Sequence, residues 1–147
     1  MKTQSRRSFL GKLGGLSASA FLLSYADIFA KQSGKVKITD IKTMVFQAPG
    51  TNYASGRTFT LVKVETDAGI FGIAEAYGTP GLGIKEAIHG LKEMFIGKDP
   101  IQIDRLYTGY RYTDGSAHAQ QRAMSGIEMA LWDLAGKILD VPTHSLM

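Results

Sequence analysis

Residues 123–137 read AMSGIEMALWDLAGK, the most regular helical pattern in the chain. Apolar side chains recur here and just beyond at a spacing of three or four, and so share one helix face: Ala123, Ile127, Ala130, Leu131, Leu134 and Ile138. Asp140-Val141-Pro142 ends the helix, because proline cannot continue one. Burial of the four large aliphatic side chains would stabilise the fold by roughly 6–12 kcal/mol before the entropic cost. The stretch therefore predicts a long helix with one buried face.

The chain before this helix shows the alternation that is typical of strands. From residue 36 to residue 46 apolar side chains alternate, with one change of parity near Thr39-Asp40 that a β-bulge would produce. Two further runs, 58–66 and 70–76, are rich in β-branched or apolar residues. Residues 67–69 between them end in glycine, which adopts a positive φ at little cost and closes a hairpin. These patterns predict a three-stranded antiparallel meander.

Two shorter helices are predicted between the sheet and the long helix. The first has apolar residues at helical spacing, followed by Gly97 as a stop: Ile84, Ile88, Leu91 and Phe95. The second begins with Asp99 as N-cap, Pro100 at the first helical position and Gln102 placed to return the capping hydrogen bond. The expected fold class is therefore α+β, a three-stranded antiparallel meander followed by a helical segment.

Length and composition narrow the class of protein. The 147 residues, 44% of them apolar, suit one ordinary domain and are too few for a barrel enzyme with a cap. A charged content of 20% and a mean hydropathy of −0.03 exclude a disordered polyelectrolyte. Four of the 17 Lys and Arg lie in residues 1–26, where no acid occurs, so 13 cations and 13 acids remain elsewhere. We expect no nucleic-acid surface on a folded part with balanced charge.

The N-terminus has the pattern of a targeting segment. Residues 5–12 read SRRSFLGK and precede a short apolar stretch, 13–23, that small residues interrupt. The pattern resembles a twin-arginine export signal. An amphipathic helix or an uncleaved anchor is the alternative, although the stretch is too short to cross roughly 30 Å of hydrocarbon. We expect a signal peptide over 1–26, a linker over 27–35, and a periplasmic domain over 36–147 with no stable membrane insertion.

The sequence contains no compact catalytic motif. It lacks a His-Glu-x-x-His helix, a Gly-x-Ser-x-Gly elbow, a Walker loop, a dinucleotide-binding glycine pattern and any cysteine. His89, His118 and His144 lie far apart, and of these His118, at a helix entrance, is the best placed to reach a site. For Glu75 we favour a structural ion pair over a functional role, and for Asp133 a buried hydrogen bond or ion pair. We therefore assign no catalytic and no metal-ligating residue.

Three stretches together resemble the N-terminal capping domain of the enolase superfamily, of the mandelate racemase/muconate lactonizing enzyme type. They are residues 66–75 (TDAGIFGIAE), the helix start at 98–100, and the helix over 123–137 with Val141-Pro142 after it. The similarity covers the chain from Val36 to its end. Its Ala-Leu-Trp-Asp segment is the most characteristic part.

The resemblance implies an activity whose chemistry lies outside this sequence. Members of the superfamily abstract the proton α to a carboxylate and hold the resulting enediolate on magnesium. Their base and three acidic metal ligands lie at strand ends of a (β/α) barrel that follows the cap. This sequence stops at Met147, where relatives enter the barrel. We therefore expect magnesium only in a full-length enzyme and no turnover by this fragment.

The resemblance also implies a capping role for two loops. In relatives, the loops after the first and third strands close over the barrel mouth, exclude water and contact the distal part of the substrate. Here these loops are 48–57 and 77–81. Their polar and aromatic residues are the candidate substrate contacts, with ordinary solvation as the alternative for each: Asn52, Tyr53, Arg57, Tyr77 and Thr79.

The region over 110–118 resembles that of acid-sugar dehydratases, which favours loss of water from an aldonic or aldaric acid. A racemase, epimerase or cycloisomerase of the same superfamily is the alternative. A second class of function is a small exported binding module without catalysis. The expected partners are a small carboxylate or sugar acid and, for the full-length protein, further copies of itself.

Overall fold

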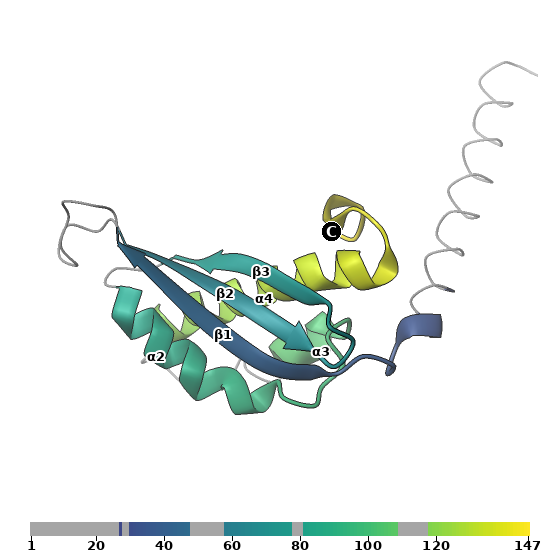
Figure 1. Cartoon of the computed structure of the whole chain (residues 1–147), viewed down its shortest axis with the longest axis horizontal. Coiled ribbons are helices and arrows are strands. Elements are labelled where there is room, and N and C mark those ends of the chain that lie inside the picture. Colours follow the sequence, from purple (N-terminus) through teal and green to yellow (C-terminus); the bar gives the residue numbers. More distant parts are fainter. Residues whose placement is uncertain (1–26, 28–29, 48–57, 78–80, 109–117) are drawn as a thin grey trace, which may run out of the picture. The chain divides into compact units, whose positions relative to one another are not determined.

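The computed structural model describes residue 27 and residues 30–47, 58–77, 81–108 and 118–147. The chain divides into two units, Met1–Gln32 and Ser33–Met147. In the first unit, Asp27 and residues 30–32 are helical. Among the helices in the described part of the chain, none combines the length and the apolar character that crossing a bilayer requires. The second unit holds a sheet and the remaining helices (Figure 1).

A three-stranded antiparallel sheet forms one layer of the second unit. Its strands lie side by side in sequence order: β1 (Ile38–Gln47), β2 (Thr58–Thr66) and β3 (Phe71–Ala76). The register of β1 against β2 shifts between Ile38 and Asp40, where the change of apolar parity predicted a bulge. Gly69 has a φ of 74°, and its N–H donates to the Thr66 carbonyl at 3.1 Å. The predicted meander, its bulge and its glycine turn are confirmed.

Helices cover one face of this sheet (Figure 1). The helical elements follow β3 in the chain: α2 (Gly81–Leu91), η2 (Lys92–Met94), α3 (Ile103–Thr108), α4 (His118–Leu139) and η3 (Thr143–Ser145). Helices α2 and α4 contact each other, and both contact the sheet. Helix α4 ends at the predicted place, because Asp140 leaves the helical conformation with a φ of 54°.

The core lies between the sheet and these two helices. Val62 and Val64, on the inward face of β2, are fully buried. The stripe predicted on α4 is buried along its whole length: Ala123, Ile127, Ala130, Leu131, Leu134 and Ile138. The stripe predicted on α2 and the turn after it is buried as well: Ile84, Ile88, Leu91 and Phe95. The two helix faces and the α+β fold class are confirmed.

Two glycines bring the backbones of α4 and β3 into direct contact. A Cβ atom on Gly72 would lie 2.0 Å from the carbonyl oxygen of Ala130, and one on Gly126 would lie 2.5 Å from the Cβ of Ala76. Gly72 comes before Ala76 in β3, but their contacts on α4 occur in the reverse order, since Ala130 comes after Gly126. Strand β3 and helix α4 therefore run in opposite directions. The N-terminal end of α4 therefore lies where β3 ends.

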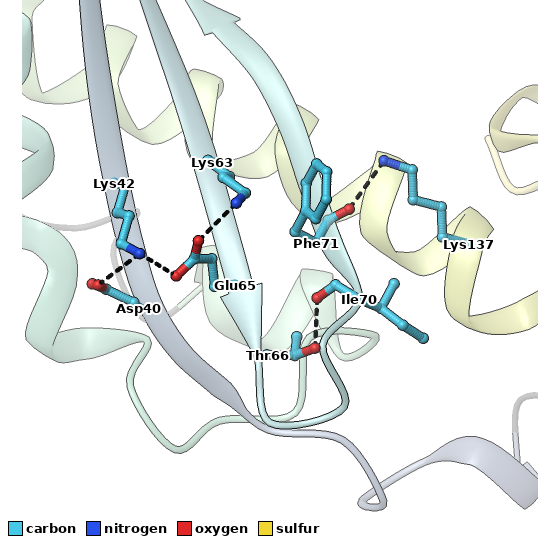
Figure 2. Close-up of polar contacts among 8 residues, drawn as sticks. All are labelled: Asp40, Lys42, Lys63, Glu65, Thr66, Ile70, Phe71 and Lys137. Carbon is cyan, nitrogen blue, oxygen red and sulfur yellow. Dashed lines mark hydrogen bonds and ion pairs between the residues drawn. The ribbon is translucent and has the colours of Figure 1, made fainter.

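Asp133 and Lys137 fasten α4 to the edge of β3. The Asp133 carboxylate accepts a hydrogen bond from the Ile73 N–H at 2.8 Å and pairs with Lys137 at 2.6 Å. The Lys137 ammonium also donates to the Phe71 carbonyl at 3.0 Å (Figure 2). Because β3 is an edge strand, these backbone groups have no neighbouring strand to bond. Asp133 thus forms both a hydrogen bond and an ion pair, but its side chain is 31% exposed, so the prediction that this contact is buried is wrong.

The second predicted helix start lies too early in the sequence. Helix α3 begins at Ile103, whereas Asp99 caps a turn that precedes it. One Asp99 oxygen accepts from the Ile101 N–H at 3.1 Å. The other accepts from Ser33 Oγ at 3.0 Å, from the Gly34 N–H at 2.7 Å and from Gln102 Nε2 at 3.2 Å. The buried carboxylate thus holds residues 33 and 34, near the end of the expected linker, against the turn.

On the outward face of the sheet, away from α2 and α4, charged side chains of β1 and β2 form ion pairs (Figure 2). Glu65 binds Lys42 at 2.6 Å and Lys63 at 2.7 Å. These two hydrogen bonds lower the pKa of Glu65, and the partnership with Glu65 raises the pKa of Lys42. Asp40 pairs with Lys92 at 2.5 Å, which lowers the pKa of Asp40.

The lowered pKa of Glu65 predicts acid sensitivity. A carboxylate with a lowered folded pKa stabilises the fold above its ordinary pKa of 4.5, and this contribution is lost as the pH falls through the folded value. We expect the melting temperature to fall between about pH 7 and about pH 3, and to fall less in Glu65→Gln. Glu86→Gln, at an exposed position of α2, is the control. Thermal melts measure the change. An equal fall in the melting temperature of Glu65→Gln and of the wild type would show that Glu65 does not cause the acid sensitivity.

Candidate functional site

The candidate site lies at the end of the sheet where β1 ends, β2 begins and β3 ends. Residues 48–57 connect β1 to β2, and residues 78–80 lie between β3 and α2, so both segments leave the sheet at this end. The predicted contacts Asn52, Tyr53, Arg57 and Thr79 lie outside the described residues. Tyr77 is described, and it is 71% exposed directly after β3.

Tyr77 meets a cation from α4. The guanidinium carbon of Arg122 lies 5.6 Å from the centroid of the Tyr77 ring, which is the range of a cation–π interaction. The contact follows from the backbone arrangement, because Gly126 packs on Ala76 and Arg122 lies one helical turn before Gly126. An aromatic face and a guanidinium, both solvent-accessible, are thereby fixed beside each other.

These two side chains line a hollow of about 380 Å³. Its lining comes from the end of β3 and the first half of α4: Glu75, Tyr77, Gln121, Arg122, Ser125, Gly126 and Met129. The Ser125 hydroxyl donates to the Gln121 carbonyl at 3.0 Å, which leaves its oxygen free to accept. The hollow therefore offers hydrogen-bond donors, acceptors and an aromatic wall, a combination that suits a polar ligand.

Glu75 is the only carboxylate among the residues that line this hollow. It is exposed, and within the described ranges it forms no salt bridge, so the structural ion pair expected for it is not found there. Glu75 and Arg122 give the hollow one charge of each sign. Such a pair can orient hydroxyl and carboxylate groups of a ligand.

His89 and His144, which the sequence also offered, are not among the residues that line this hollow. His89 and His144 are exposed, on α2 and η3. His118 begins α4, as its predicted place at a helix entrance requires. In the part of the chain that the structure describes, no three His, Cys, Asp or Glu side chains are grouped as a metal site would need.

Sequence reasoning did not identify Arg122, Gln121 or Ser125 as site residues. A signal for them exists, because Arg122, Ser125 and Met129 recur at helical spacing beside the buried stripe of α4. Only the close approach of Gly126 to Ala76 shows that this second stripe faces the end of β3.

A second hollow, of about 450 Å³, lies near the opposite end of the sheet. Lys37, Lys98 and Arg105 line it together with Asp99. The Asp99 carboxylate is already occupied by the four hydrogen bonds described above. This hollow adjoins neither of the two segments expected to close over a substrate, so the first hollow is the better candidate.

Comparison with known proteins identifies the family. A family model described as mandelate racemase/muconate lactonizing enzyme, N-terminal domain, matches residues 35–147. A D-xylonate dehydratase from Haloferax volcanii is 40% identical over 115 residues, which are 76% of this chain and 26% of that protein. A D-galactonate dehydratase from Xanthomonas campestris pv. campestris is 37% identical over 106 residues, 66% of this chain and 26% of that protein.

Solved structures agree with this match. A mandelate racemase/muconate lactonizing enzyme-like protein from Rubrobacter xylanophilus superposes with a TM-score of 0.62 at 35% identity, over 75% of this chain and 27% of that one. A mandelate racemase/muconate lactonizing enzyme from a Sulfitobacter species gives a TM-score of 0.65 at 29% identity, over 76% of this chain and 29% of that one. The chain thus spans about a quarter of the length of the curated relatives it matches. It belongs to the mandelate racemase/muconate lactonizing enzyme family of the enolase superfamily, in which it corresponds to the N-terminal domain.

Proposed function

We propose that this chain is the capping and substrate-specificity portion of a magnesium-dependent acid-sugar dehydratase. The observation that carries the proposal is the hollow formed by Glu75, Tyr77 and Arg122 at the loop-bearing end of the sheet. The relatives named D-xylonate dehydratase and D-galactonate dehydratase support an aldonic acid as the substrate. The reaction would begin with removal of the proton α to the carboxylate and end with loss of water.

In this proposal the chain binds and encloses the distal part of the substrate. The Arg122 guanidinium donates hydrogen bonds to hydroxyl or carboxylate oxygens, and the Glu75 carboxylate accepts from hydroxyl groups. The Tyr77 ring forms a wall of the hollow and shields the bound chain of the sugar acid from water. Residues 48–57 and 78–80, which carry the other predicted contacts, would close over it.

The described residues do not fit a magnesium site. The hollow offers Glu75 as its one carboxylate, beside a guanidinium, and the rest of the described chain has no group of three acidic or histidine side chains. We therefore derive no catalytic step within this chain. The proposal assigns the metal and the proton-abstracting base to a barrel domain of the complete enzyme.

A domain replacement tests the proposal. Residues 35–147 of this chain would replace the matching segment of the Haloferax volcanii D-xylonate dehydratase, and the hybrid would be assayed with magnesium on a panel of acid sugars. We expect loss of water from at least one of them. An epimerised product without loss of water would instead support the racemase or epimerase alternative. A folded, metal-loaded hybrid that changes none of the acids would contradict the proposal.

Arg122→Gln in this hybrid should weaken substrate binding. Loss of a charged hydrogen-bond donor is expected to raise KM about tenfold or more and to change kcat less, because the contact exists in both the ground state and the transition state. Arg105→Gln, on α3 and outside the hollow, is the matched control. If both variants show the same KM, Arg122 does not contact the substrate.

We also propose that the protein is exported to the periplasm by the twin-arginine route. The support is the SRRSFLGK pattern and the apolar stretch after it, which lie outside the described residues. Replacing Arg6 and Arg7 by lysine should retain the protein in the cytoplasm, as cell fractionation would show. Unchanged export would contradict the assignment.

A further inference from the structure

The second hollow, of about 450 Å³, carries three cationic side chains, and we call it the basic hollow. Its cations come from three parts of the chain: Lys37 precedes β1, Lys98 follows η2, and Arg105 lies on α3. Two of these parts are joined by backbone hydrogen bonds, because the Ile38 N–H donates to the Lys98 carbonyl at 3.0 Å and the Gly97 N–H donates to the Ile38 carbonyl at 2.9 Å. The backbone that carries Lys37 and Lys98 is therefore fixed.

Within the described ranges, the three cations of the basic hollow form no ion pair. The lysines that do pair with a carboxylate lie elsewhere: Lys42, Lys63, Lys92 and Lys137. Asp67 accepts a hydrogen bond at 2.9 Å from the Lys37 backbone N–H, not from its ammonium group, and Asp67 does not line the hollow. Lys98 and Arg105 are exposed and Lys37 is half-buried, so a ligand can reach all three.

Asp99 is the only carboxylate among the residues that line the basic hollow. It is 8% exposed, and its two oxygens accept the four hydrogen bonds described above. With three cations and one carboxylate, the lining has a net charge of +2. The hollow therefore attracts anions, and a dianion would neutralise its lining.

Gln102 connects the buried Asp99 carboxylate to Arg105. Its Nε2 donates to Asp99 at 3.2 Å, and its Oε1 accepts from Nη1 of Arg105 at 3.4 Å. The Arg105 guanidinium is thereby oriented through one of its nitrogens. Its remaining N–H groups form no other hydrogen bond with the described residues, so they are available as donors to an anion.

We propose that the basic hollow binds a small organic phosphate monoester. The phosphate group has about two negative charges at neutral pH and several acceptor oxygens, which ammonium and guanidinium groups bind well. Met94, which is 41% exposed, and the half-buried Leu106 also line the hollow and would contact the organic part. The volume of the hollow lies in the range of roughly 300–1,000 Å³ that is typical of small-molecule sites.

The basic hollow is separate from the candidate site described above. It lies near the opposite end of the sheet, and the two hollows share no lining residue. The proposal therefore does not depend on the enzymatic activity proposed for the complete enzyme.

An amide NMR titration of the full, isotope-labelled chain with phenyl phosphate tests the proposal. We expect saturable shifts of the Gly97, Lys98 and Arg105 amide signals, with a dissociation constant of about 1 mM or lower. Lys98→Gln should raise this constant about tenfold, because a charged hydrogen-bond donor to the phosphate is lost. Lys85→Gln, at an exposed position of α2 outside the hollow, is the matched control and should bind like the wild type.

Two further ligands identify the chemistry that the hollow recognises. Phenyl sulfate has the same ring and a single negative charge, and it should bind at least about tenfold more weakly than phenyl phosphate. Inorganic phosphate lacks the ring, so it should bind at least about threefold more weakly. Equal binding of phenyl phosphate and either of these ligands would contradict the assignment of an organic phosphate monoester.

Circular dichroism would establish that both variants keep the secondary structure of the wild type. The absence of saturable shifts at about 10 mM phenyl phosphate, a concentration at which even a weak specific complex would form, would overturn the proposal. It would also be overturned if Lys98→Gln and Lys85→Gln bound phenyl phosphate equally well, because binding would then not depend on the basic hollow.

Discussion

Gly72→Ala is expected to lower the free energy of unfolding by roughly 3 kcal/mol. Its new methyl group would lie 2.0 Å from the Ala130 carbonyl oxygen and 2.7 Å from the Leu134 Cβ, and neither atom belongs to a flexible side-chain end. Strand β3 and helix α4 would have to separate, which weakens the helix–sheet packing that supports the hollow. Urea unfolding followed by circular dichroism measures the change.

The matched control for this prediction is Gly83→Ala. Gly83 lies on α2, and a Cβ added there would meet no atom within 4 Å. Alanine has the higher helix propensity, so this variant should be as stable as the wild type or slightly more stable. If Gly72→Ala also had wild-type stability, the direct backbone contact between β3 and α4 would be wrong.

Asp99→Ala is expected to lower the free energy of unfolding by a similar amount, roughly 3 kcal/mol. The substitution removes the acceptor of four hydrogen bonds, three of which come from Ser33, Gly34 and Ile101. Two of these donors are backbone N–H groups in a partly or fully buried place, and they would lose their partner without a replacement. Faster hydrogen exchange at Gly34, together with the loss in urea unfolding, would identify the cause.

Asp104→Ala provides the comparison for Asp99. Asp104 is exposed in the first turn of α3, so its removal should cost less than about 0.5 kcal/mol. Equal stability losses in the two variants, or unchanged exchange at Gly34 in Asp99→Ala, would show that the Asp99 carboxylate does not hold residues 33 and 34.

The parts of the fold that were predictable depend on local periodicity. The β-branched run over 58–66 predicts β2, and the 3.6-residue period gives the buried face of α4, because each signal is contained in a few consecutive residues. The parity change near Asp40 likewise predicts the bulge. Helix α3 begins later than predicted, and no local pattern shows that the Asp99 carboxylate also binds Ser33 and Gly34, which are more than sixty residues away in the sequence.

The candidate site was less predictable because it also depends on contacts between residues that are far apart in the sequence. Tyr77 follows a strand directly, and the family resemblance assigned it to a loop that contacts the substrate. Its partner Arg122 lies on a different element, and only the contact of Gly126 with Ala76 brings the two together. The pairing thus depends on how α4 crosses β3, which no pattern within either segment contains.

Substrate binding and proton abstraction are proposed to lie in different domains of the complete enzyme. The described residues supply the Tyr77 ring, the Arg122 guanidinium and the Glu75 carboxylate, which in the proposed function position the sugar acid. Proton abstraction is proposed to need a metal site and a base from another domain.

Exchange of the α-proton of D-xylonate with solvent deuterium tests this separation most directly. The purified 147-residue chain and the hybrid enzyme would each be incubated with magnesium in D₂O, and the α-proton signal followed by NMR. The account predicts no exchange by the chain alone, and exchange or loss of water with the hybrid. Exchange catalysed by the chain alone would contradict it, because the base would then lie within these residues.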